Sequence, residues 1–231
     1  MKLVSANESD KRQAAQIDQF VKEGVDLLII SPNKNNTITP AIERAYDKGI
    51  PVVLLDRKIN SNKYTAYIGA DNVNVGRELG RYLAQKTGGK ARIVEILGLP
   101  GSSSSAERHQ GFVEALQAYP GMKIVQQRYG DWQPKSARLC MDSVLKSGVD
   151  FDCVFSHNDR MAIAARNVVE ERGIKRPITY IGVDGLPVPG GGVDNVRDGR
   201  LEASYIYPTR GDLVIQLAMT ILNHEPFNRI N

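Results

Sequence analysis

Residues 24–33 have the sequence GVDLLIISPN, in which a glycine and a run of large apolar residues lead to a polar end. A continuous apolar run of this kind is typical of a strand that helices cover on both faces, as in a parallel sheet. Residues 148–159, GVDFDCVFSHND, repeat the arrangement, and in both halves a second glycine comes 25 residues after the first. This repetition predicts two lobes of similar topology, although a glycine at a helix end before an apolar strand is also a common local pattern.

Short apolar runs alternate with helical patterns along the whole chain. Strands are predicted at residues 2–5, 26–31, 51–56, 66–69, 91–97, 122–126, 152–156, 178–183 and 203–207. Apolar residues recur every three to four positions in 14–21, 75–83, 112–119 and 161–168, which predicts helices there. The alternation predicts an α/β protein made of two Rossmann-like lobes with parallel sheets flanked by helices.

The composition of the 231 residues excludes several classes of protein. A hydrophobic fraction of 42% with 24% charged residues is that of a globular chain, and no apolar run approaches the ~18 residues of a membrane span. The net charge is only +4 and the basic residues form no run, so no direct contact with nucleic acid is expected. Cys140 and Cys153 have neither disulfide-framework nor zinc-site spacing, and no metal or cofactor is predicted.

Common catalytic motifs are missing from the sequence, which contains no GxSxG, GxxxxGK[ST], GxGxxG or HExxH. The serines of residues 101–105 lack the lysine of a phosphate loop, so a flexible loop that caps a helix is the better interpretation. His109, His157 and His224 lie far apart and are expected at the surface or at helix ends. We therefore predict that this region is not an enzyme.

Polar side chains follow the predicted strands in both halves. Because ligands of open parallel sheets bind at the carboxyl ends of the strands, two lobes facing each other would form a cleft lined by these residues. They are Asn33, Asp56, Arg57, Asn158, Asp159 and Asp184.

This set of side chains suits a small polyol. Asp56 and Asp184 could flank a glycosidic bond as an acid and base pair, but their polar neighbours favour ionised carboxylates that accept hydrogen bonds from sugar hydroxyls. Arg57 and Arg108 can each donate two parallel hydrogen bonds. Trp132, the only tryptophan, lies in a polar segment and either packs in the core or offers an aromatic face to sugar C–H groups.

The order of several short motifs resembles the ribose-binding-protein type of periplasmic sugar-binding proteins, whose fold is shared by the effector domains of lac-repressor-type regulators. These motifs are Ser31-Pro32-Asn33, Leu55-Asp56-Arg57, Gly69-Ala70-Asp71-Asn72, Glu107-Arg108-His109-Gln110-Gly111-Phe112, His157-Asn158-Asp159-Arg160-Met161-Ala162 and Gly182-Val183-Asp184-Gly185. More narrowly, residues 67–72, 130–132, 185–192 and 203–209 are similar to the extracytoplasmic sensor domains of hybrid two-component histidine kinases.

The resemblance implies a type I periplasmic binding protein that holds a monosaccharide between two lobes. It implies a first lobe of residues 1–70 plus 208–231 and a second lobe of residues 71–207. It also implies that the first strand and helix of the first lobe are missing, so that the chain is expected to be part of a longer protein. The ligand-binding residues that it implies are Asp56, Arg57, Arg108, Trp132, Asn158, Asp184 and Tyr207.

The implied function is the recognition of a pentose or hexose in the periplasm, signalled by closure of the lobes. The protein would be a sensor attached to the inner membrane through flanking segments, with histidine kinase activity elsewhere in the full chain, and a homodimer would fit this role. The alternatives are the soluble binding protein of a sugar ABC transporter and the effector domain of a lac-repressor-type regulator.

Overall fold

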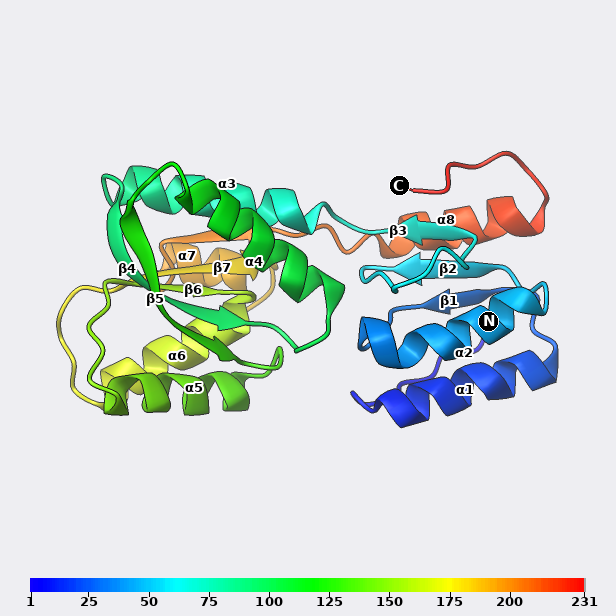
Figure 1. Ribbon diagram of the computed structural model, residues 1–231, viewed down its shortest axis with the longest axis horizontal. Helices are drawn as coiled ribbons and strands as arrows, with labels where there is room; N and C mark the ends of the chain where they lie inside the picture. Colours follow the sequence, from blue (N-terminus) through cyan, green and yellow to red (C-terminus); the bar gives the residue numbers. More distant parts are fainter. Residues whose placement is uncertain (231) are drawn as a thin grey trace. The chain divides into compact units, whose positions relative to one another are not determined.

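The computed structural model describes residues 1–230, and it divides into two compact units (Figure 1). The first unit contains residues 1–70, the short turn 101–104 and the chain from Thr209 onward. The second unit contains residues 71–100 and 105–208. The turn at 101–104 thus belongs with the first unit, whereas the sequence placed it in the second lobe.

The first unit is a parallel sheet of order β1-β2-β3 between helices. Alternate residues of its strands face opposite sides: Leu28 and Val52 pack with helices α1 and α2, whereas Val53 and Ile68 pack with helix α8. Two-sided burial explains why these strands are apolar throughout. The elements are α1 (Asp10–Glu23), β1 (Leu28–Ile30), α2 (Asn35–Asp47), β2 (Val52–Leu55), β3 (Ala66–Ile68) and α8 (Gly211–Leu222).

The strand predicted at residues 2–5 is wrong, because these residues pair with no strand. Leu3 is 90% exposed, and the Ser5 carbonyl accepts a hydrogen bond from the Gln16 side chain of helix α1. A β pattern in the sequence becomes a strand only where a neighbouring strand supplies hydrogen bonds and an apolar face supplies burial. Residues 2–5 have neither.

The second unit is a parallel sheet of order β5-β4-β6-β7-β8. Helices α3 and α4 cover one face and helices α5 and α6 cover the other (Figure 1). The elements are α3 (Asn72–Lys86), β4 (Lys90–Leu97), α4 (Ser103–Leu116), β5 (Gly121–Tyr129), α5 (Pro134–Lys146), β6 (Cys153–Ser156), α6 (Asp159–Glu171), β7 (Thr179–Asp184), α7 (Gly192–Arg197) and β8 (Ala203–Ile206).

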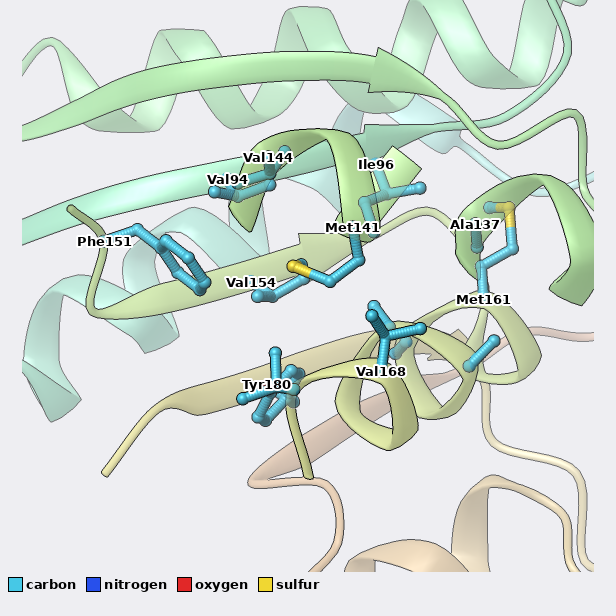
Figure 2. Close-up of a cluster of buried hydrophobic side chains, with 14 of the residues drawn as sticks. Val94, Ile96, Ala137, Met141, Val144, Phe151, Val154, Met161, Val168 and Tyr180 are labelled. Carbon is cyan, nitrogen blue, oxygen red and sulfur yellow. The ribbon is translucent and has the colours of Figure 1, made fainter. Parts of the chain in front are cut away.

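Each face of this larger sheet carries a core of its own. Val94 and Val154 point toward helices α5 and α6, where Met141 and Phe151 are fully buried (Figure 2). The next residues along the strands, such as Phe155, point to the opposite core under helices α3 and α4. Both cores hold the strands in register, so that all their carboxyl ends lie along one sheet edge.

The repeated pattern in the sequence corresponds to repeated structure. Gly24 and Gly148 both follow a helix with a left-handed φ of 69°, and each precedes a strand, a helix and a second parallel strand. Gly49 and Gly173 occupy the matching place before that second strand, with φ values of 83° and 70°. The predicted similarity of the two halves is confirmed for the segments α1-β1-α2-β2 and α5-β6-α6-β7.

Helices α3 and α4 touch backbone to backbone. A Cβ atom on Gly76 would lie 2.0 Å from the Arg108 carbonyl oxygen, and one on Gly111 would lie 1.8 Å from the Val73 carbonyl oxygen. No larger residue fits at this crossing without moving a helix. The two glycines therefore set where helix α4, and Arg108 on it, lies against helix α3.

The serine-rich segment lies at a helix start, as the predicted helix-capping role requires, but most of it belongs to the helix itself and not to a loop. Ser103, Ser104 and Ser105 form the first turn of helix α4, and Ser102 before them is buried. The Ser102 and Ser104 hydroxyls form a hydrogen bond of 3.0 Å. Serine hydroxyls can satisfy backbone and side-chain groups near a helix start, which is why these small polar residues tolerate burial here.

Candidate functional site

Asp56 and Arg57 directly follow strand β2 in the first unit. Asp56 has a left-handed φ of 66°, and its N–H group donates to the Ile68 carbonyl of strand β3 at 2.8 Å. The Arg57 guanidinium lies near the Asp56 carboxylate, with Nε 3.6 Å from Oδ2. Its Nη1 donates to the Asn33 carbonyl at 3.3 Å. The two predicted ligand residues of this unit thus form one polar group at the carboxyl end of the sheet.

Asn33, which the sequence predicted to line the cleft, has a structural role in the first unit. Its backbone N–H donates to the Gln13 side chain at 2.9 Å, and its Nδ2 donates to the Glu8 carbonyl at 3.0 Å and to the Asp10 carboxylate. Both protons of its amide nitrogen are therefore used to fasten the start of helix α1 to the end of strand β1.

Arg108 lies at the centre of the polar group in the second unit and is 4% exposed. Its Nε donates to Asn72 Oδ1 at 2.8 Å, and its Nη1 donates to the His157 carbonyl at 2.5 Å. The guanidinium carbon lies 4.7 Å from the ring centre of Tyr207 and 5.4 Å from that of Trp132. Among the described residues, Arg108 forms no ion pair, and its Nη2 forms no hydrogen bond.

Trp132 and Asn158 complete this group. Asn158 Oδ1 caps helix α6 by accepting from the Met161 N–H at 2.8 Å, and its Nδ2 donates to the Trp132 carbonyl at 3.3 Å. The indole packs against the Gly98 backbone so closely that a Cβ there would lie 2.2 Å from it. Trp132 is therefore a packing residue of the second unit and an aromatic neighbour of Arg108, and its contact with sugar C–H groups stays a prediction.

Asp184 ends strand β7 with a φ of 116°, a conformation that favours glycine. Its carbonyl accepts from the Tyr207 N–H at 3.0 Å, which connects it to the same group of residues. The next residue, Gly185, donates its N–H to Asp159 Oδ2 at 2.8 Å. Burial, together with repulsion from Asp184, raises the pKa of the Asp159 carboxyl to about 7.

The structure thus brings Arg108, Trp132, Asn158 and Tyr207 together in the second unit, with Asp184 joined to them through the backbone. Asp56 and Arg57 form the group of the first unit. Sequence reasoning missed Asn72 as a partner of Arg108, although this residue stood in one of the motifs and begins helix α3 shortly after strand β3.

His157 lies two residues before the start of helix α6, which agrees with the predicted position at a helix end, but the alternative of a surface position is wrong. Its side chain is fully buried and contacts the Glu95 carboxylate of strand β4. Its neighbours Asn158 and Asp159 are polar, so the sequence around His157 did not predict a buried side chain. Neither sequence pattern nor spacing linked His157 to Glu95, which lies between the buried apolar residues Val94 and Ile96 of strand β4.

Residues 1–230 contain neither a cluster suited to a metal ion nor a helix suited to a membrane. Within this part of the chain, no group of three or more His, Cys, Asp or Glu side chains is arranged to hold a metal ion. No helix over the same residues combines the length and apolar character that a bilayer crossing requires.

Comparison with known families gives a match over residues 1–226 to the periplasmic binding protein domain. The chain belongs to this family. Membership confirms the resemblance, and the structure confirms the α/β class with parallel sheets flanked by helices.

Curated relatives of the chain include sugar-binding proteins. The chain is 30% identical over 202 residues to the ribose import binding protein RbsB of Bacillus subtilis, which covers 87% of this chain and 64% of that protein. It is 32% identical over 196 residues to the galactofuranose-binding protein YtfQ of Escherichia coli, over 81% of this chain and 62% of that protein. This periplasmic binding protein domain therefore spans slightly less than two thirds of the length of these relatives.

Solved structures of the family agree with the fold. The fructose-binding periplasmic domain of the hybrid two-component system BT1754 matches with a TM-score of 0.97 and 45% identity, over 100% of this chain and 77% of that one. The arabinose ABC transporter binding protein of Shewanella sp. ANA-3 matches with a TM-score of 0.91 and 28% identity, over 99% of this chain and 78% of that one.

Proposed function

We propose that this periplasmic binding protein domain binds a monosaccharide, a pentose or a hexose, through the polar groups at the carboxyl ends of its two sheets. The observation that carries the proposal is the buried Arg108 guanidinium, which has no ion-pair partner among residues 1–230. A buried cation without a counter-charge is costly unless acceptors solvate it. Sugar hydroxyl and ring oxygens are acceptors of the right size.

The residues around Arg108 suit a sugar in other ways. Carboxylates and amides can pair with vicinal hydroxyls, and aromatic rings can pack on the apolar C–H face of a sugar. Asp184, Asn158 and Trp132 would supply these contacts from the second unit. Asp56 and Arg57 would supply them from the first.

A sugar contacted by both units would also act as a switch. Such a ligand favours the arrangement of the lobes in which all contacts are made at once, and it shifts the population by its difference in affinity between the arrangements. In the proposed cleft between the lobes, this differential affinity would favour the closed arrangement, and closure would be the signal.

We assign the domain to the periplasmic sensor of a hybrid two-component system, with kinase activity in the remainder of the protein. The support is the 45% identity to a sensor domain of that type, against 28% to the arabinose transporter component. The soluble binding protein of a sugar ABC transporter is the second candidate, because the curated relatives RbsB and YtfQ are binding proteins.

Calorimetry with the 231-residue chain tests the binding proposal. D-Fructose, D-ribose, L-arabinose and D-galactose are titrated in turn, with D-glucuronate as an anionic control. We expect at least one neutral sugar to bind with 1:1 stoichiometry and D-glucuronate to bind more weakly. Heat from D-glucuronate alone would make Arg108 part of an anion site, and no heat from any compound would overturn the proposal.

Cell fractionation of the native host tests the choice between the two candidates. An antibody against the chain should detect a protein that stays with the inner membrane after osmotic shock and is much larger than 25.5 kDa. Release of a protein only slightly larger than the chain into the shock fluid would instead favour the transporter component.

A further inference from the structure

A buried carboxylate lies beneath the polar group of the second unit. Glu95 on strand β4 is fully buried, yet it has three polar partners. Its carboxylate accepts from His157 Nε2 at 3.1 Å, from His109 Nδ1 at 2.9 Å and from Gln127 Nε2 at 2.8 Å. A buried carboxylate stays ionised only where hydrogen bonds of this kind replace those it made to water. The three donors therefore allow Glu95 to be charged inside the sheet.

The protonation states of Glu95 and His157 follow from their surroundings. Burial alone would raise the pKa of the Glu95 carboxyl, but the hydrogen bonds from His109 and His157 outweigh it and bring the pKa to about 2. Burial lowers the pKa of His157, whose ring is therefore neutral at pH 7. The ionised Glu95 can only accept, so His157 must carry its single ring proton on Nε2.

This choice of tautomer leaves Nδ1 of His157 as an acceptor. The Gly98 N–H lies 3.3 Å from Nδ1 and donates to it, and the Ser105 hydroxyl lies 3.4 Å from it. In the other tautomer, a proton on Nδ1 would face the Gly98 N–H and two donors would oppose each other. Glu95 thus keeps the ring in the state that holds Gly98.

His157 is connected to three of the proposed sugar contacts. Its carbonyl accepts from Arg108 Nη1, and Asn158 follows it in the chain. Its ring centre lies 6.3 Å from that of Trp132, whose indole packs on the Gly98 backbone. A displaced His157 would therefore move Arg108, Asn158 and Trp132 together.

We propose that Glu95 and His157 form a positioning pair for sugar binding, in which the buried carboxylate fixes the His157 tautomer and so holds Gly98, Arg108 and Trp132 in their binding geometry. The inference rests on the proposed function for its sugar. The claim that Glu95 fixes the His157 tautomer and the position of Gly98 does not depend on a sugar, and NMR measures it separately.

The test compares three variants with the native chain. Glu95→Leu removes the carboxylate and frees the tautomer. His157→Asn places an amide oxygen where Nδ1 was, so that Gly98 keeps an acceptor that does not depend on Glu95. The double variant combines both changes, and His109→Gln is the control, because it removes a partner of the same carboxylate without touching His157.

D-Fructose affinity is measured by calorimetry, and the His157 tautomer by two-bond ¹H–¹⁵N NMR. We expect Glu95→Leu to alter the tautomer and to weaken D-fructose binding by about tenfold or more, the effect of one buried unpaired group. The double variant should bind within about threefold of His157→Asn, and His109→Gln within about twofold of the native chain. Should D-fructose not bind the native chain, the titrations use the panel sugar that does.

Native affinity in Glu95→Leu with an altered tautomer would overturn the proposal. If Glu95→Leu does not fold, His157→Asn is compared with His157→Gln, whose side chain reaches Glu95 but leaves the Gly98 N–H without an acceptor. Tighter sugar binding by His157→Gln than by His157→Asn would also overturn the proposal. If no sugar binds the native chain, the proposed function fails. The Gly98 N–H and Arg108 Nε–H resonances then decide the geometric claim: they should shift in Glu95→Leu and stay in place in His109→Gln.

Discussion

Arg108 shows how one side chain can be held and still remain available to a ligand. Two of its nitrogens donate to Asn72 and His157, and the rings of Trp132 and Tyr207 lie within 5.4 Å of its guanidinium carbon. Because the guanidinium is fixed in this way, it loses little conformational entropy when a ligand binds. Its remaining N–H groups are donors held in a fixed planar geometry. This pre-organisation should matter more for affinity than the positive charge itself.

Arg108→Lys tests that point, because it keeps the charge and removes the fork. We expect the variant to lose ~2–5 kcal/mol of sugar binding free energy, nearly as much as Arg108→Ala. Calorimetry with the sugar that binds the native chain measures both. Binding by Arg108→Lys within twofold of the native chain would mean that charge alone is sufficient.

Asp184→Ala is expected to lose a similar ~2–5 kcal/mol, since sugar donors would be left without their acceptor in a desolvated site. The matched control is Asp194→Ala on helix α7, whose carboxylate pairs with Arg197 at the surface. Native affinity in Asp184→Ala would place this residue outside the sugar site.

Asp159 should make stability depend on pH. Its pKa of about 7 in the folded chain lies above the ordinary value of 3.8, so the folded state keeps a proton that the unfolded state has released between these two values. Stability contributed by this group is therefore present below pH 4 and falls as the pH rises through 7. Asp159→Asn removes the titration and keeps the shape.

Urea unfolding at about pH 5 and about pH 8 measures this effect. We expect the native chain to lose at least ~1.4 kcal/mol more than Asp159→Asn between the two values, the equivalent of one pKa unit. Comparing the two proteins cancels the other titrating groups, such as His157. Equal losses in both proteins would show that Asp159 is ionised in the fold.

At the scale of secondary structure, the elements predicted correctly are those whose apolar residues follow the faces that are buried in the fold. The runs at 52–55 and 153–156 are apolar throughout because helices cover both faces, so eight of the nine predicted strands are found within a few residues. Residues 2–5 have a similar local pattern without a partner strand, and local pattern cannot supply one. The same limit applies to His157, whose burial depends on a carboxylate 62 residues away.

The crossing of helices α3 and α4 also offers a test at this scale. Gly111→Ala places a methyl group against the Val73 carbonyl, and we expect it to cost ~1–3 kcal/mol of stability by overpacking and to weaken sugar binding through Arg108. Gly211→Ala at the start of helix α8 is the control, because that position has open space and no left-handed φ. Thermal unfolding should show a lower midpoint for the first variant and an equal or higher one for the second.

For the whole molecule, the two units have separate hydrophobic cores, and the single tryptophan lies in the second. Tryptophan fluorescence therefore follows the second unit, whereas circular dichroism follows both. A sugar that contacts both units should stabilise them together, by ~2.7 kcal/mol at a hundred times its Kd. Urea curves from the two probes should then shift equally; a full shift in fluorescence with only a partial shift in circular dichroism would mean that the sugar binds the second unit only.

If Asp56 and Asp184 bind the sugar as proposed, their left-handed backbone sets folding against recognition. Each non-glycine residue in such a conformation costs of order 1 kcal/mol, which glycine would avoid. A library of the two positions selected only for resistance to heat should therefore enrich glycine at both, and the same library selected on immobilised sugar should return aspartate. Deep sequencing of the two selections would reveal how much stability this domain gives up to present two carboxylates.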